Sequence, residues 1–186
     1  MKTTNEKIVT AALSLFGTKG YSGTSMRDLA DELGVVPGAI YKHYPSKHDV
    51  YQAIVREMEK HEERFWERSA PREGASVSLE DVDCFVRDMI HFWTGEQFPA
   101  AFRRLLTSQQ YGSTEMTKTY QHYFGDGPVE YLNRLLIRAG VSSPENTALR
   151  LWSLSLLLMT VHDSPTAPGR IMSRLDRLIG ETIRRA

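Results

Sequence analysis

Apolar residues recur every three or four positions along the first part of the chain, the spacing of one buried helix face. Between residues 5 and 18 this repeat falls on Ile8, Ala11, Ala12, Leu15 and Phe16. Gly17 and Gly20 follow at its end, where glycine commonly terminates a helix. The pattern predicts an amphipathic helix over residues 5–18.

Two Ser-x-x-Asp sequences mark the starts of further helices. Ser25 with Asp28, and Ser46 with Asp49, can bond the free N–H groups of a first turn. Between them Pro37 suits the first turn of a short helix that continues to Tyr44. From Ser46 we expect a long helix over about 47–68.

A stretch rich in Ser, Ala, Pro and Gly separates this N-terminal region from the remainder. It covers Ser69–Ser78, and we interpret it as a linker. Helical segments are expected beyond it near residues 79–95, 97–110, 114–139, 144–162 and 168–185, the last opening at Pro168. Gly125-Asp126-Gly127-Pro128 should kink or split the third of them. The chain is therefore predicted to be all-α, with about nine helices and no strand.

Three small or branched residues have the spacing of a helix-turn-helix. Ala30 permits two helices to cross closely, Gly34 gives the turn its backbone freedom, and Ile40 fills the core from the second helix. This predicts a three-helix DNA-binding domain over residues 1–48 and a larger helical domain over 49–186. An ordinary helical bundle with solvated lysines is the alternative.

Local charge favours DNA binding although the whole chain is neutral. The 186 residues contain 23 Lys and Arg against 23 Asp and Glu, a formal net charge of +0. However, no acidic residue occurs from Leu33 to His48, a run that holds Lys42, His43 and Lys47. Such a patch can neutralise phosphates by itself.

The segment GTSMRDLADELGVVPGAIYKHYPSKHDVYQAIV resembles the signature of the TetR family of transcriptional regulators. The resemblance covers residues 5 to about 58 and is strongest from Tyr41 through Ser46-Lys47. It implies a homodimer whose two recognition helices bind a palindromic double-stranded DNA operator. The single cysteine fits the reducing cytoplasm that we expect for the protein. It also implies a repressor that an unidentified small-molecule inducer releases by binding to the C-terminal domain.

The resemblance also assigns DNA contacts to individual residues. Thr24 and Ser25 correspond to phosphate contacts, Arg27 to a backbone or groove-edge contact, and Tyr41 and Lys47 to phosphate anchors. The positions that face the bases are Pro37, Gly38, Lys42 and His43. Val36 stands where the family often has Ser or Thr, so the helix that begins at Pro37 lacks a side-chain cap. Instead of bonding to a phosphate, Val36 could contact a thymine methyl group.

Aromatic and sulfur side chains are concentrated in the middle of the chain, as in an apolar ligand pocket. The expected pocket residues, with Gln109 and His122 as the polar contacts, are Met89, Trp93, Phe102, Gln109, Tyr120, His122 and Phe124. A plain hydrophobic core is the alternative for each of them.

Residues 149–161 carry two apolar stripes, so both sides of this helix must be covered. Together with the last helix it predicts a four-helix dimer interface, and burial within one domain is the alternative. The expected interface residues are Leu149, Trp152, Leu156, Met159, Ile171, Leu175, Leu178 and Ile179.

Other classes of function find little support in the sequence. There is no clustered His and Cys spacing for a metal and no phosphate-binding glycine loop, so we expect neither an enzyme nor a cofactor. No apolar stretch is long enough for a membrane span. The single cysteine, Cys84, has apolar neighbours and is expected to be buried. The competing function is a helical ligand-binding or scaffold protein that does not use DNA.

Overall fold

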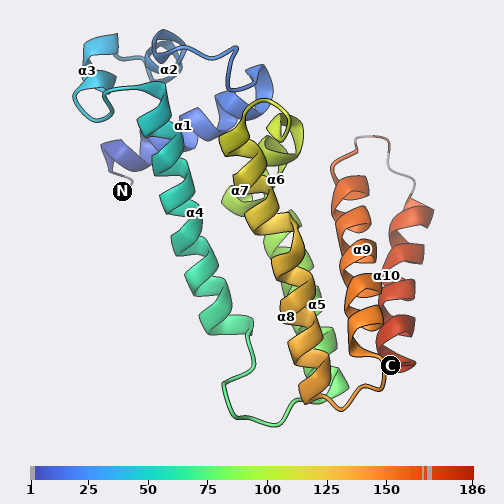
Figure 1. Cartoon of the computed structure of the whole chain (residues 1–186). Coiled ribbons are helices and arrows are strands. Elements are labelled where there is room, and N and C mark those ends of the chain that lie inside the picture. The colour runs from blue at the N-terminus through green and yellow to red at the C-terminus, as the bar shows by residue number, and fades with distance from the viewer. Residues whose placement is uncertain (1–2, 165, 167–168) are drawn as a thin grey trace. The chain divides into compact units, whose positions relative to one another are not determined.

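The computed structural model describes residues 3–164, 166 and 169–186, which form ten helices and no strand (Figure 1). The extra helix relative to the sequence prediction arises because residues 114–139 are divided at Gly125, as the Gly-Asp-Gly-Pro sequence indicated. Pro168, expected to open the last helix, lies outside the described residues. No helix among the described residues is long and apolar enough to cross a membrane.

Helix starts agree with the capping signals in the sequence. Ser25 with Asp28 forms a complete capping box, and Ser46 accepts a hydrogen bond from the Asp49 N–H at 3.2 Å. The helices are α1 Thr4–Lys19, α2 Met26–Leu33, α3 Pro37–Tyr41, α4 Lys47–Ser69, α5 Leu79–Thr94, α6 Gln97–Gln109, α7 Thr114–Phe124, α8 Asp126–Arg138, α9 Pro144–His162 and α10 Gly169–Arg184.

The chain divides into two compact units, and the first contains the helix-turn-helix. It runs up to Arg64 and includes Gln97–Lys118. Within it α1 packs against α2 and α6, and α2 packs against α3. Its core includes the fully buried side chains of Phe16, Leu29 and Tyr51. This division follows packing, whereas the boundary at residue 48 between a DNA-binding domain and a larger domain concerns function and stays a prediction.

The second unit comprises Phe65–Glu96 and Thr119–Ala186. Within it α9 packs against both α8 and α10, and α5 contacts all three of these helices (Figure 1). Arg87 on α5 reaches α10, where its Nη1 lies 2.8 Å from Asp176 Oδ1. The predicted linker is non-helical between α4 and α5, and Arg138 Nη2 donates to its Arg72 and Ala75 carbonyls at 2.8 and 2.9 Å.

Candidate nucleic-acid interface

The helix-turn-helix has the geometry that the spacing predicted. Gly34 adopts a left-handed conformation with φ 65° and ψ 33°, which a residue with a side chain rarely adopts. Its N–H donates to the Asp31 carbonyl at 3.1 Å, and the Val35 N–H donates to the Ala30 carbonyl at 3.0 Å. These two bonds are the Schellman arrangement that ends a helix and turns the chain. Ala30 and Ile40 are buried where α2 and α3 meet, as expected.

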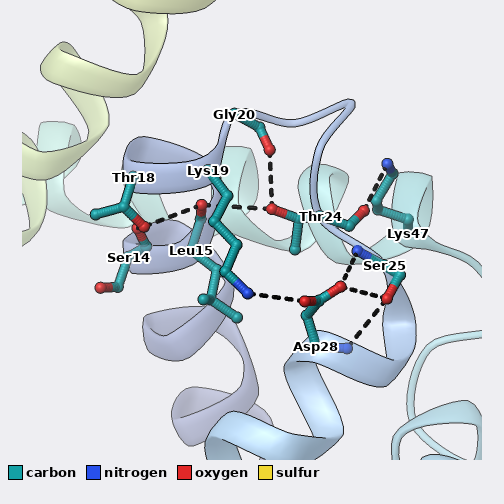
Figure 2. Close-up of polar contacts among 9 residues, drawn as sticks. All are labelled: Ser14, Leu15, Thr18, Lys19, Gly20, Thr24, Ser25, Asp28 and Lys47. Carbon is teal, nitrogen blue, oxygen red and sulfur yellow. Dashed lines mark hydrogen bonds and ion pairs between the residues drawn. The ribbon is translucent and has the colours of Figure 1, made fainter.

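A charged network joins the end of α1 to the start of α2 (Figure 2). The Asp28 carboxylate accepts hydrogen bonds from the Ser25 N–H at 2.8 Å and from the Ser25 hydroxyl, and it lies 2.8 Å from Lys19 Nζ. The hydrogen bond from Lys19, followed by those from Ser25, holds the pKa of Asp28 well below its usual range. The carboxylate therefore stays charged and fixes the first turn of α2.

Thr24 was predicted to contact a phosphate, but its side chain does not face outward. Its side chain is only 2% exposed, and its hydroxyl donates to the carbonyls of Gly20 at 2.8 Å and Leu15 at 3.4 Å (Figure 2). The prediction for this side chain is wrong, because these internal bonds turn it away from solvent. Thr24 instead holds the connection between α1 and α2 in shape.

Lys47 also bonds to this connection. Its Nζ donates to the Tyr21 carbonyl at 2.6 Å and the Thr24 carbonyl at 2.8 Å, and it lies 4.5 Å from the centroid of the Tyr21 ring. A lysine ammonium has three donors, so these two bonds leave one for another acceptor. Lys47 is therefore a positioning residue for the loop, and its predicted contact with phosphate rests on that remaining donor.

The other predicted DNA contacts share one property, which is access to solvent. Pro37 is half-buried, and the exposed residues are Ser25, Arg27, Val36, Gly38, Tyr41, Lys42 and His43. Arg27, Lys42 and His43 make no ion pair with any described residue. The exposed residues therefore include two cations, Arg27 and Lys42, that are available to an external anion.

Helices α6 and α7 support the loop and α4 from within the same unit, a contact that the sequence did not predict. The Tyr21 N–H donates to Gln109 Oε1 on α6 at 3.3 Å, and the Tyr21 ring packs edge-on against Phe16 at 5.1 Å. On α7, Glu115 accepts a hydrogen bond from Gln52 and lies 3.3 Å from His48 Nδ1. Nothing local in the sequence pairs Tyr21 with a residue 88 positions away.

Most of the predicted pocket residues are buried, but they are not all in one unit. In the second unit Phe124 packs against Trp93 at 4.8 Å and Tyr120 at 5.3 Å, and Met89 is also buried. Phe102 and Gln109 belong to the first unit, where Gln109 bonds to the loop. His122 is exposed, so our prediction that it contributes a polar group to a buried pocket is wrong.

The predicted dimer residues fall into two groups. Trp152, Met159, Leu175 and Ile179 are buried in the second unit's own core, where Trp152 stacks on Phe124 at 6.4 Å. Leu156 is half-buried, and Leu149, Ile171 and Leu178 are exposed, together with Leu157, which we did not predict. The apolar surface available to a partner is therefore best represented by the four exposed residues.

The cysteine prediction was wrong. Cys84 is exposed on α5, whereas the next two residues, Phe85 and Val86, are buried. One residue is a rotation of about 100° around a helix, so apolar neighbours in the sequence do not imply burial. No group of three or more His, Cys, Asp or Glu among the described residues is placed to hold a metal ion.

The segment that contains the helix-turn-helix is similar to known proteins. Residues 8–54 match the family model of the bacterial regulatory proteins of the tetR family. This N-terminal segment is therefore similar to the TetR family. A curated relative is IcaR of Staphylococcus aureus (strain Newman), the negative transcriptional regulator of a biofilm operon, which is 35% identical over 51 residues. That match covers 27% of this chain and 27% of the relative's length.

Solved structures of transcriptional regulators resemble the chain over nearly all of its length. PfmR of Thermus thermophilus has a TM-score of 0.70 at 21% identity, over 99% of this chain and 97% of that one. A regulator from Saccharomonospora viridis, described in complex with choline, has a TM-score of 0.67 at 14% identity, over 97% and 95%. At these identities the likeness shows a TetR-like fold. The proteins named above are described as regulators.

Proposed function

We propose that this chain is a DNA-binding transcriptional regulator of the repressor type, and that α2 and α3 form its DNA contact. The observation that carries the proposal is the exposed face of the helix-turn-helix, where Arg27, Lys42 and His43 have no carboxylate partner among the described residues. A helix of this motif enters the major groove while the preceding helix crosses the backbone. The alternative remains a helical ligand-binding or scaffold protein that does not use DNA.

The proposal includes a homodimer on a palindromic operator and release by a small molecule. Exposed apolar side chains on α9 and α10 support the dimer, since two copies would cover them. The buried aromatic cluster around Phe124 in the second unit offers the apolar surroundings that small molecules use. The neighbour in complex with choline indicates that a protein of this fold can hold a small molecule.

Salt dependence tests DNA binding directly. Duplexes would first be selected from a random-sequence pool with the purified protein, and the binding of a selected duplex would then be measured by fluorescence anisotropy over a range of salt. We expect affinity to fall as salt rises, because bound phosphates release counterions. Arg27→Ala should weaken binding and reduce the slope of log affinity against log salt by about 1 for each protomer bound.

A matched control separates the position of the charge from its mere removal. Arg64 is an exposed arginine in the same unit, 17 residues along α4 from Lys47, which corresponds to about 25 Å of helix. Arg64→Ala should leave the affinity and the salt slope unchanged. The regulator proposal fails if no duplex is enriched, or if binding ignores both salt and Arg27.

A further inference from the structure

Two valines of the helix-turn-helix are exposed where the rest of its apolar residues are buried. Val36 is 72% exposed and Val35 is 42% exposed, whereas Leu29 and Ile40 are fully buried. Both valines lie between the end of α2 and the first residue of α3, beside the exposed Gly38. We call Val35 and Val36 the valine patch.

The segment from the valine patch to Ile40 has no side chain that can donate or accept a hydrogen bond. Its sequence is Val-Val-Pro-Gly-Ala-Ile, and Val36 caps α3 without a side-chain hydrogen bond. Pro37 also lacks a backbone N–H. Hydrogen-bonding side chains on α3 and its end begin only at Tyr41, followed by Lys42 and His43. Side chains at the start of α3 can therefore contact bases only through apolar atoms.

One base carries an apolar group on the major-groove edge, namely thymine with its C5 methyl. The valine patch and the exposed Lys42 and His43 flank the same short helix, and no acidic residue occurs from Leu33 to His48 to repel phosphates. Resting on the proposed DNA-binding function, we propose that Val36 reads a thymine methyl group in each operator half-site. The start of α3 then recognises bases by apolar contact and its end by hydrogen bonds.

The substitution of deoxyuridine for thymine tests this proposal, because it removes the methyl group and leaves the base pair's hydrogen bonds unchanged. In a selected duplex, each thymine of one half-site would be replaced in turn, and affinity measured at fixed salt. We expect one or two positions at which the wild type loses about fourfold in affinity, the factor for burying one methyl group. Val36→Ala should bind the thymine duplex more weakly and lose less than about twofold on the same replacement.

Arg27→Ala is the matched comparison, since it weakens binding through charge. It should retain the full deoxyuridine effect at the same positions, and circular dichroism would verify that each variant is folded. The inference is overturned if no replacement changes the affinity of a duplex that binds in a salt-dependent manner. It is also overturned if the loss is equal in the wild type and in Val36→Ala. In both cases the proposal that the protein binds DNA stands. Failure to select any duplex would instead contradict DNA binding, on which the inference about Val36 rests.

Discussion

At the scale of single residues, the polar side chains of the helix-turn-helix have two different tasks. Thr24 and Lys47 bond to backbone carbonyls inside the unit, and Asp28 bonds to Ser25 and Lys19. Arg27 and Lys42 leave their charges, and His43 leaves its ring, exposed to solvent. The first group holds the backbone in shape, and the second group is exposed to contact DNA. Substitutions in the first group should therefore weaken DNA binding by disturbing the structure, and those in the second group by removing a contact.

Asp28 provides a prediction that depends on pH. Its pKa is lowered in the folded state, so the carboxylate stabilises the fold at pH values above its unfolded value of about 4. This contribution is lost as the pH falls through the folded value, where the group becomes protonated in both states. Asp28→Asn should therefore lower the urea midpoint at pH 7, and the difference from the wild type should shrink as the pH falls below about 4.

Asp31→Asn is the control for this measurement, because Asp31 is an exposed acid of the same helix that makes no ion pair with any described residue. It should change the midpoint less at pH 7. A difference between Asp28→Asn and the wild type that is equally large at pH 7 and pH 3 would contradict the assigned role.

At the scale of elements, α6 stabilises the connection between α1 and α2 by a single side chain. Gln109 Oε1 accepts a hydrogen bond from the Tyr21 N–H at 3.3 Å, and Lys47 Nζ donates to the Tyr21 carbonyl at 2.6 Å. The Tyr21 carbonyl also accepts the Thr24 N–H at 3.3 Å, so side chains of other helices add to a hydrogen bond within the loop. The loop has no regular secondary structure of its own, so it depends on these bonds.

Gln109→Ala should therefore loosen the loop. The Tyr21 N–H loses its acceptor, which costs about 1 kcal/mol because the partly exposed site admits water. Amide hydrogen exchange at Tyr21 should become faster by roughly fivefold, the factor that corresponds to this free energy. DNA affinity should fall by less than this, since the exposed cations remain.

Gln110→Ala is the neighbouring control. Gln110 Nε2 donates to the Thr107 carbonyl of α6 at 3.1 Å and to no other residue in the part of the chain that the structure describes. Exchange at Tyr21 should be unchanged in this variant. If both substitutions speed exchange equally, general fraying of α6 is the cause and the specific link to Tyr21 is refuted.

The sequence predicted elements well because their signals are local. The Ser-x-x-Asp caps and the positions of Gly and Pro placed most helix ends within one or two residues, although α3 ends at Tyr41, before the predicted Tyr44. Which way a given residue faces was harder to predict. Lys47 bonds to carbonyls 26 and 23 residues away, which only the tertiary fold brings close. The exposure of His122 and Cys84 depends on the rotation of a helix against its neighbours.

At the scale of the whole molecule, the exposed apolar residues of α9 and α10 raise the question of assembly. The two helices run side by side in the second unit, and their exposed leucines and isoleucine are unlike the charged surface expected of a solvent-facing helix (Figure 1). Trp152 is unsuited to a test of the dimer, because it is buried against Phe124 and its loss would damage the fold. Leu178, which is 37% exposed on α10, avoids this difficulty.

Leu178→Glu should produce a folded monomer. A charge placed in an apolar interface must be desolvated in both copies, so the dimer dissociation constant should rise by on the order of 100-fold. Sedimentation velocity over a range of concentrations measures the shift, and circular dichroism checks the helix content.

Ile137→Glu serves as the comparison, because Ile137 is 58% exposed on α8 and is not one of the four exposed apolar residues of α9 and α10. It should leave the association unchanged. A wild type that sediments as a monomer at all concentrations would refute the interface, as would a Leu178→Glu variant that remains dimeric.

The two carbonyl bonds of Lys47 have a consequence for genetics. A screen for mutants that no longer repress a reporter would recover substitutions at Lys47 and Thr24 beside those at Arg27, although Thr24 is buried. A map of such mutants alone would outline a footprint on DNA larger than the true one. Second-site suppressors would separate the groups, because a change that stiffens the loop restores the Lys47 and Thr24 mutants and cannot return a missing charge to Arg27.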